Sequence, residues 1–333
     1  MTGRESLSRY ARIMARFRRV RIVVVGDLIA DEFIYGRVER VSREAPVLIL
    51  HYDATEVVPG GAANAASNAA ALGAHVEVIG VLGRDEPGRR LLQVLSKGSA
   101  TSGIVQTARY STPVKTRILA GGVHSAKQQV VRIDRAGGRI NPALRRRVAR
   151  AVARAMTRAD AVIMSDYGGG LVTPDLWQHA HAGAKRTRAP LLLVDSRYAL
   201  ANFRGLTACT PNESEVEALL GIQIGDDRGV LERAGRTLLE RLACRAVLIT
   251  RGSRGMALFE SGCPTDHIPI VGSDQIADVT GAGDTVIAAF SVALAAGATY
   301  GEAARLANYA GGLVVMKRGT ATVSAEELSA ALQ

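Results

Sequence analysis

The stretch Asp278-Val279-Thr280-Gly281-Ala282-Gly283-Asp284 stands directly before an apolar run from Thr285 to Ala296. The run predicts a helix, and small residues at its start allow several backbone N–H groups to turn inward together. A helix N-terminus also carries about half a positive charge. We therefore expect Gly281, Ala282 and Gly283 to form an anion hole suited to a transferring phosphoryl group. Asp284 is placed to accept a proton from an attacking hydroxyl; a Gly-rich turn with a capping Asp is the alternative.

Five continuous apolar runs predict strands that are buried on both faces of a sheet. They are Ile22–Val25, Val76–Val81, Ala161–Met164, Leu191–Val194 and Ala246–Ile249. Helix signals lie between them, including an Asn–Pro start and a Gly after the end. These helices are expected at Asn64–Leu72, Pro142–Met156, Pro174–Lys185, Glu213–Leu220 and Gly229–Leu242. The alternation predicts an α/β fold with a mostly parallel central sheet covered on both faces.

Two stretches break this alternation. Glu32–Tyr52 has no helical period and Pro113–Asp134 carries β-formers on either side of a Gly pair, so both predict hairpin strands outside the main sheet. We expect them to form a small β lid, from about 32–57 and 112–134, over the C-terminal edge of the sheet. A two-stranded excursion without a role is the alternative. No repeat or low-complexity linker interrupts residues 1–333, which favours one domain with a lid.

The composition is that of a globular protein. The chain has 333 residues, of which 47% are hydrophobic and 22% charged, and this balance excludes disorder as the main state. The net charge of +11 has two interpretations, an anionic partner or a solvated Arg-rich surface. The arginines are mostly scattered along the chain, which favours the second. We therefore expect no nucleic-acid partner.

The cysteine content and the hydropathy of the chain indicate the cellular compartment in which the protein is expected. The three cysteines, Cys209, Cys244 and Cys263, are odd in number and lack CxxC spacing, which favours a reducing compartment. The apolar run Val286–Ala296 is far shorter than the ~20 residues that span a bilayer, so we expect no membrane partner. The basic N-terminus lacks a signal-peptide apolar region. We expect the N-terminus to form a short helix before the first strand of a cytoplasmic protein.

Other motifs are weaker, and each has a structural alternative. Gly60 and Gly61 would let a ligand approach the backbone, although two glycines before a helix are common. Asp31 follows the first strand, where open α/β sheets bind ligands, or is a turn residue. The segment Asn212–Glu215 is either a helix cap or a set of groups near metal-bound phosphates. Thr250–Gly255 is either a hairpin turn or a nucleotide cradle. The chain has no Walker A, HExxH or GxSxG motif, and the spacing of its histidines argues against zinc.

Taken together, these segments resemble the ribokinase-like (PfkB) carbohydrate kinases over nearly the whole chain. Gly60-Gly61 with Asn64 resembles the first signature of that family, and Asp278–Asp284 resembles the highly specific second one. The resemblance implies a ribokinase-like three-layer sandwich with a β lid. It also implies an ATP- and Mg²⁺-dependent phosphotransferase, with a monovalent-cation requirement left open, and a homodimer that pairs through the lid strands.

The resemblance also implies site residues. Asp284 would be the general base beside the anion hole of Gly281, Ala282 and Gly283. The positions that match the ATP site are Asn212, Glu213, Ser214, Glu215, Thr250, Gly252, Gly255 and Asn308, with Glu215 as the Mg²⁺ ligand. The positions that match the sugar site are Asp31, Gly60, Gly61, Asn64, Lys127, Gln129 and Arg197.

Within the family, Glu44-Ala45-Pro46-Val47, Ser165-Asp166-Tyr167 and Thr210–Glu215 resemble the heptose-7-phosphate kinases. That resemblance implies phosphorylation of the anomeric hydroxyl of D-glycero-D-manno-heptose 7-phosphate. Such kinases are often fused to a nucleotidyltransferase; this chain ends at Gln333 without an HxGH motif, so we expect the kinase half alone. It departs from the pattern at Ala126, Gly169 and Ser196, where basic residues are expected. Lys127 and Arg197 could replace those charges, or the sugar could carry no phosphate.

Three functions therefore stay open at this point. The first is the heptose-7-phosphate kinase, and the second is a related kinase with another sugar or sugar phosphate as substrate. The third is a non-catalytic, sugar-responsive regulator that contacts nucleic acid through Arg145-Arg146-Arg147. The intact base and anion hole favour an enzyme, since a regulator would need neither.

Overall fold

The computed structural model describes residues 3–121, 127–184, 189–271 and 278–333. Within these residues, nine strands form one sheet in the order β13-β12-β11-β10-β9-β8-β1-β4-β5. The seven strands from β11 to β5 run parallel, and the β11–β12 and β12–β13 pairs are antiparallel. The strand bounds are β1 Arg21–Gly26, β4 His75–Gly83, β5 Ala100–Thr107, β8 Ala161–Asp166, β9 Leu191–Ser196, β10 Ala208–Cys209, β11 Ala246–Thr250, β12 Met256–Glu260 and β13 Asp266–Ile268.

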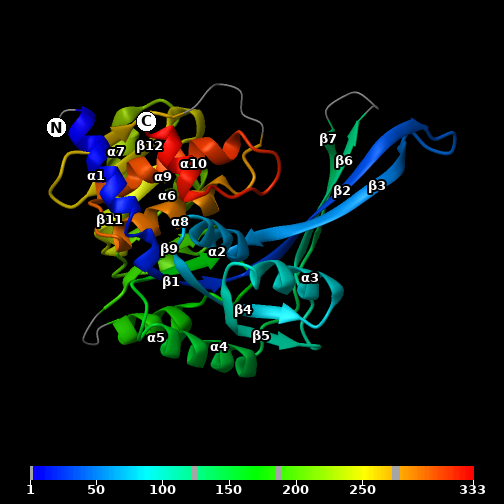
Figure 1. Cartoon of the computed structure of the whole chain (residues 1–333), viewed down its shortest axis with the longest axis horizontal. Helices are drawn as coiled ribbons and strands as arrows, with labels where there is room; N and C mark the ends of the chain where they lie inside the picture. Colours follow the sequence, from blue (N-terminus) through cyan, green and yellow to red (C-terminus); the bar gives the residue numbers. More distant parts are fainter. Residues whose placement is uncertain (1–2, 122–126, 185–188, 272–277) are drawn as a thin grey trace.

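Helices cover both faces of this sheet because successive strand side chains alternate between two apolar cores. In β1, Val24 packs into one core with helices α1, α2, α3, α8, α9 and α10, while Val23 and Val25 pack into the other with α4, α5, α6 and α7. Figure 1 shows α4 and α5 on the opposite side of the sheet from α2 and α8. The helix bounds are α1 Gly3–Met14, α2 Ala62–Ala71, α3 Glu86–Leu95, α4 Pro142–Ala155, α5 Pro174–Ala184, α6 Glu213–Leu220, α7 Arg228–Leu242, α8 Ala282–Ala295, α9 Tyr300–Val315 and α10 Ala325–Ala331.

The expected α/β three-layer architecture is thus confirmed, although several elements begin or end one to three residues from the expected positions. Helix α8 begins at Ala282, three residues before the expected start, because Gly281 adopts a left-handed conformation (φ 78°) that places the small residues in the first turn. Helix α5 is described to Ala184, and its expected last residue, Lys185, lies outside the described residues.

The small sheet consists of β2 Leu28–Val41, β3 Leu48–Gly61, β6 Val114–Gly121 and β7 Gln128–Arg135, in the order β3-β2-β6-β7. β2 pairs antiparallel with β3 and parallel with β6, and β6 pairs antiparallel with β7. It extends away from the body of the molecule in Figure 1. The end of the small sheet that joins the body is called its root here. The connections there are short, because β2 begins two residues after β1 and β3 ends at Gly61, the N-cap of α2. The expected excursion therefore exists as a separate four-stranded sheet.

None of the helices in the described part of the chain combines the length and the apolar character that a bilayer-spanning segment needs.

Candidate active site

The residues at the start of α8 face a cavity of about 450 Å³ at the carboxyl ends of the parallel strands. Such an edge is where open α/β sheets bind ligands. The cavity brings together nine of the residues expected at the site: Asp31, Gly61, Arg197, Asn212, Glu215, Thr250, Gly281, Gly283 and Asp284. These residues come from both sheets, so the cavity is built jointly by the body and the small sheet.

Asp284 is the best positioned base in this cavity. Its side chain is buried, and it accepts two hydrogen bonds, one from Asn64 Nδ2 to Oδ2 and one from the Tyr167 hydroxyl to Oδ1, each 2.9 Å. Burial raises the pKa of Asp284 to about 7, and the nearby Asp31 charge adds to this, while the two hydrogen bonds and Lys115 lower it. A carboxylate with a pKa near neutrality is suited to taking a proton from an alcohol.

Asn64 is itself held in place by the first turns of α2. Its Oδ1 accepts a hydrogen bond from Asn68 Nδ2 at 3.0 Å, and its Nδ2 also lies 3.3 Å from the Gly281 carbonyl oxygen. These contacts fix the orientation of the amide, so that its N–H group points at Asp284. Asn64, which is expected to bind the sugar, therefore donates its hydrogen bond to the Asp284 carboxylate in this structure.

The backbone before Asp284 is open toward the cavity. A Cβ at Gly281 would stand 2.5 Å from Asn64 Nδ2, so a side chain there would displace the amide that holds the base. A Cβ at Gly283 would meet nothing within 4 Å. The Ala282 amide nitrogen lies 3.3 Å from the Val279 carbonyl oxygen, so its N–H group is shared with the turn. This arrangement can accept an anion at the helix start.

The root of the small sheet supplies Asp31 and the cations around it. Asp31 is buried, its carboxylate lies 3.0 Å from Arg117 Nη1, and it accepts a 2.9 Å hydrogen bond from the Thr320 hydroxyl. Gly60 lies behind this carboxylate, because a Cβ there would stand 2.7 Å from the Asp31 Cγ. Gly60 thus makes room for Asp31, whereas Gly61 lines the cavity itself.

An apolar pocket of about 160 Å³ adjoins the cavity and shares Thr250, Val279 and Gly283 with it. It contains four further expected residues, Gly252, Gly255, Ala282 and Asn308. Asn308 donates a 2.7 Å hydrogen bond to the Pro269 carbonyl oxygen and so fixes one wall. Glycines and aliphatic side chains form most of the surface, which fits a flat, apolar ring such as a nucleotide base.

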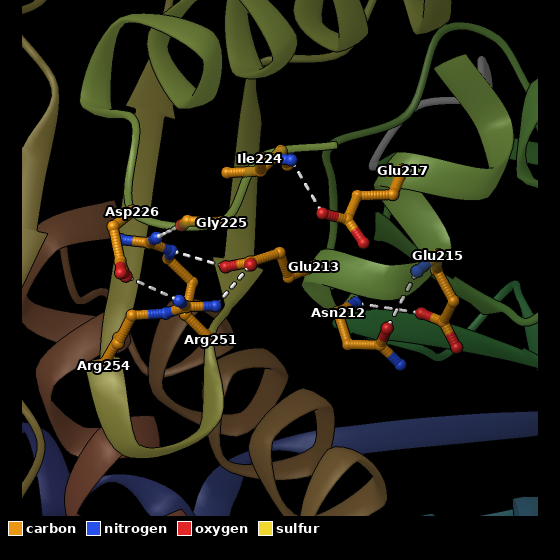
Figure 2. A network of polar contacts seen from close by, with 9 residues as sticks. All are labelled: Asn212, Glu213, Glu215, Glu217, Ile224, Gly225, Asp226, Arg251 and Arg254. Atoms are coloured by element: carbon orange, nitrogen blue, oxygen red, sulfur yellow. Dashed lines mark hydrogen bonds and ion pairs between the residues drawn. The ribbon is translucent and has the colours of Figure 1, made fainter. Parts of the chain in front are cut away.

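Of the four expected residues at the start of α6, Figure 2 shows Asn212, Glu213 and Glu215, whose side chains serve two different contacts. Asn212 and Glu215 form a capping box with two 2.9 Å hydrogen bonds, and both line the cavity. Glu213 points the other way and binds Arg251 at 2.7 Å and also Arg254. It therefore anchors the turn between β11 and β12, which carries Gly252 and Gly255. Ser214 is exposed and lies outside the cavity lining.

Two carboxylates of the cavity could share a divalent cation with phosphates. Burial raises the pKa of Glu215, and burial with the charge of Asp284 raises the pKa of Asp195 well above its ordinary value. A cation between them would relieve this cost. Within the described residues no three acidic, His or Cys side chains converge into a complete metal site. Mg²⁺ is usually held by one or two carboxylates together with substrate phosphates, so this donor set fits it.

Lys127 and Gln129 lie away from the cavity, on the outer part of the small sheet. Lys127 Nζ binds Asp53 at 2.5 Å and lies 5.5 Å from the centre of the Tyr35 ring. Gln129 is exposed on β7. Six further residues without a role predicted from the sequence also line the cavity: Lys115, Arg117, Arg132, Asp166, Tyr167 and Asp195. For Asp166 and Tyr167 the available signal was their place directly at the end of a predicted strand.

The comparisons with known proteins agree with this geometry. A profile described as "pfkB family carbohydrate kinase" matches residues 20–328. "Bifunctional protein HldE" of Geobacter sulfurreducens is 40% identical over 322 residues, which are 96% of this chain and 64% of that protein. The protein of the same name from Desulfatibacillum aliphaticivorans is 40% identical over 320 residues, 95% of this chain and 64% of that protein. The chain thus spans about two thirds, at 64%, of the length of these relatives.

Solved structures with the same fold include Arabidopsis thaliana ribokinase complexed with ribose and ATP, with a TM-score of 0.73 and 21% identity. Phosphofructokinase-2 from Escherichia coli, in complex with substrates and products, matches with a TM-score of 0.73 and 22% identity. Each match covers 94% of this chain and 98% of the other. At these identities the likeness shows the fold, which is ribokinase-like. The family profile, which matches residues 20–328, shows that the chain belongs to the pfkB family of carbohydrate kinases, phosphotransferases that act on a sugar hydroxyl.

Proposed function

We propose that the chain transfers the γ-phosphoryl group of ATP to the anomeric hydroxyl of D-glycero-D-manno-heptose 7-phosphate. The observation that carries the kinase chemistry is Asp284, a buried carboxylate with a pKa of about 7 beside an open helix start. The heptose assignment is supported by the resemblance of several segments to heptose-7-phosphate kinases and by the relatives named HldE. A related sugar or sugar phosphate as acceptor is the second candidate.

The reaction follows from the arrangement around Asp284. The carboxylate takes the proton of the sugar hydroxyl, and the resulting oxygen forms a bond to the γ-phosphorus as the bond from that phosphorus to the ADP oxygen breaks. The N–H groups at the start of α8 stabilise the charge on the transferring group. Asn64 and Tyr167 keep the carboxylate aimed at the acceptor through their 2.9 Å hydrogen bonds. Most of the rate comes from this positioning and charge stabilisation.

ATP and Mg²⁺ find complementary groups on the α6–α8 side of the cavity. The apolar pocket with Gly252, Gly255 and Asn308 would hold the base, and the cavity wall with Asn212 and Glu215 would hold the phosphates with the metal. Mg²⁺ supplies neutralisation of phosphate charge when bound. Arg251, fixed by Glu213, keeps the turn at the edge of this pocket in place.

We further propose that the small sheet is the lid of a single kinase domain and that it pairs with a second copy. Eight exposed large apolar side chains belong to it or to its β2–β3 turn: Val38, Val41, Val47, Leu48, Tyr52, Val130, Val131 and Ile133. Exposed large apolar side chains in such number are typical of an interface. The homodimer is therefore the assembly that this sheet supports best.

A coupled ADP-release assay tests the proposed function. Heptose 7-phosphate, unphosphorylated heptose, hexoses and hexose 6-phosphates are compared with ATP and Mg²⁺, and ³¹P NMR locates the new ester. Turnover of heptose 7-phosphate to the 1,7-bisphosphate supports the proposal. Turnover of another acceptor would identify that sugar, instead of the heptose, as the substrate. If no sugar is phosphorylated and duplex DNA binds with a steep salt dependence, the kinase proposal fails in favour of a regulator.

A further inference from the structure

Asp27 is a buried carboxylate, directly after β1, that the proposed reaction leaves without a role. The residue is only 5% exposed. Among the described residues, no Lys, Arg or His side chain lies within ion-pair distance of it. A buried carboxylate without a cation is costly, so other contacts have to stabilise this one.

The contacts of the Asp27 side chain hold the turn that follows β8. Its Oδ2 accepts the backbone N–H groups of Tyr167 and Gly169, each at 2.9 Å. Hydrogen bonds to an ionised acceptor are about twice as strong as those between neutral groups. Gly169 stands where a basic residue is expected from the sequence, and a Cβ there would lie 2.5 Å from Asp27 Oδ1. The turn and the carboxylate are therefore packed closely together.

This turn carries the hydroxyl that contacts the base. Tyr167 donates its backbone N–H to Asp27 and its hydroxyl to Asp284 Oδ1, and each bond is 2.9 Å long. The residue is thus anchored at both ends, which fixes where its ring lies. The main-chain oxygen of Asp27 also accepts the N–H group of Ala62 at 3.0 Å, two residues before Asn64. Asp27 therefore contacts both segments that carry a donor to Asp284.

We propose that Asp27 is a positioning residue for phosphoryl transfer and acts on Asp284 through Tyr167. The inference goes beyond the proposed function, on which it rests, because it assigns a role to a carboxylate outside the lining of the active-site cavity. Without this carboxylate the turn loses its anchor, and the hydroxyl of Tyr167 moves away from Asp284. The base then lacks a donor that favours its ionised form, and it holds a proton more tightly.

The direction of this effect separates it from a simple change of charge. Loss of the negative charge of Asp27 would by itself lower the pKa of Asp284, whereas loss of the Tyr167 hydrogen bond raises it. The charged and titratable groups that face Asp284 are Asp31 from β2, Lys115 from β6, Tyr167 from the turn after β8 and Asp195 from β9. All four are retained when Asp27 is replaced.

The test compares the wild type with Asp27→Ala and Asp27→Asn, which lose the same charge, while only the Asn variant keeps an acceptor oxygen. Asp27→Ala should lower kcat roughly 10-fold and move the acidic limb of kcat/KM upward by roughly 0.5 pH unit, with KM for ATP within about twofold. Asp27→Asn should recover most of both losses. Asp160→Ala is the matched control, because the Asp160 carboxylate accepts the Arg21 N–H at 2.9 Å at the opposite end of β1. It should change neither kcat nor the limb.

A double variant shows whether Asp27 acts through Tyr167. In Asp27→Ala with Tyr167→Phe, the acidic limb should lie where Tyr167→Phe alone places it, because the hydroxyl is already gone. An additive shift in the double variant, a shift of Asp27→Ala to lower pH, or equal effects of Asp27→Ala and Asp160→Ala would overturn the inference. If Asp27→Ala does not fold, Gly169→Ala replaces it, since its methyl group crowds the carboxylate but keeps the charge. It should also move the limb upward, and an unchanged limb contradicts the inference.

A measurement without turnover keeps this inference separable from the proposed function. A ¹³C NMR titration of the aspartate carboxyl carbons, with the Asp284 signal assigned by its loss in Asp284→Asn, gives the pKa of Asp284 in each variant. A higher pKa in Asp27→Ala than in Asp160→Ala supports the inference even if no sugar is phosphorylated. An equal or lower pKa shows that Asp27 does not position the Tyr167 hydroxyl on the base.

Discussion

The two sheets of this molecule are buried very differently. Every residue of β8 in the large sheet is buried, whereas every residue of β7 in the small sheet is exposed. The large sheet therefore fixes what it carries, because any shift would open a packed core. The small sheet is held firmly at its root, where Asp31 and Arg117 are buried, and is free along its outer part. This difference fits the proposal that the body carries the reacting groups, while the small sheet contributes to recognition and assembly.

The largest effect is expected at the body, on the base. Asp284→Asn removes the proton acceptor while leaving the cavity shape almost unchanged, and kcat should fall by ~10²–10⁴-fold. ATP affinity, measured by fluorescence titration, should change little because the apolar pocket is intact. Turnover close to that of the wild type would show that Asp284 is not the base and that the body does not carry the chemistry.

The next effect separates the root of the small sheet from its outer part. Arg117→Met leaves the buried Asp31 charge without its cation and should lower the free energy of unfolding by about 3–5 kcal/mol. Arg37→Met breaks a pair with Asp53 in which the Arg37 side chain is 46% exposed, and should cost no more than about 1 kcal/mol. Urea denaturation measures both. Equal costs would contradict the distinction between a fixed root and a free outer part.

A third prediction concerns assembly through the small sheet. Val131→Glu and Ile133→Glu place charges on exposed positions of β7, and together they should weaken a homodimer at least ~10-fold, since buried unpaired charges are costly. Sedimentation velocity over a concentration series gives the dissociation constant. Leu7→Glu is the control, because Leu7 is similarly exposed (41%, against 47% for Val131 and 49% for Ile133) but belongs to α1 on the body. If only the control disrupts the dimer, or if the wild type is a monomer, the lid pairing is wrong.

The smallest effect is a shift in the pH profile. Activity needs ionised Asp284, so kcat/KM should fall about tenfold per unit as pH drops below the Asp284 pKa of about 7. The Tyr167 hydroxyl donates to the ionised form and lowers this pKa, so Tyr167→Phe should move the acidic limb upward by roughly 0.5–1 pH unit. Phe keeps a ring beside Lys115 Nζ, which lies 4.7 Å from the Tyr167 ring centre. If the acidic limb of the pH profile of Tyr167→Phe stays in place or moves to lower pH, the Tyr167 hydroxyl does not lower the pKa of Asp284.

Local patterns were sufficient to predict much of the fold and the centre of the site. The small residues before Asp284 and the buried strand runs act over a few residues, so their structure follows from the chain itself. Lys115 and Arg117 could not be found in this way, because they reach the cavity through the parallel pairing of β6 with β2, about 85 residues earlier, as in Asp31↔Lys115. Such pairing leaves no local signal in a single sequence.

The start of α6 shows a second limit of sequence reasoning. Glu213 and Glu215 are both acidic residues in a first turn and look equivalent in the sequence. Two positions apart on a helix, however, they face different directions. One closes the capping box beside the cavity, and the other binds Arg251. The direction of each carboxylate depends on where the β11–β12 turn lies, and this is decided by the tertiary structure.

Gly61 ends β3 and caps α2, and Asn64 follows three residues later with its amide on the Asp284 carboxylate. A short, continuous piece of backbone therefore joins β3 to Asn64, whose amide contributes to the pKa of Asp284. We expect a hinge rotation of the small sheet to reach Asn64 directly and to alter the proton affinity of Asp284. One movement of the small sheet would then both enclose the sugar and prepare the Asp284 carboxylate to accept its proton.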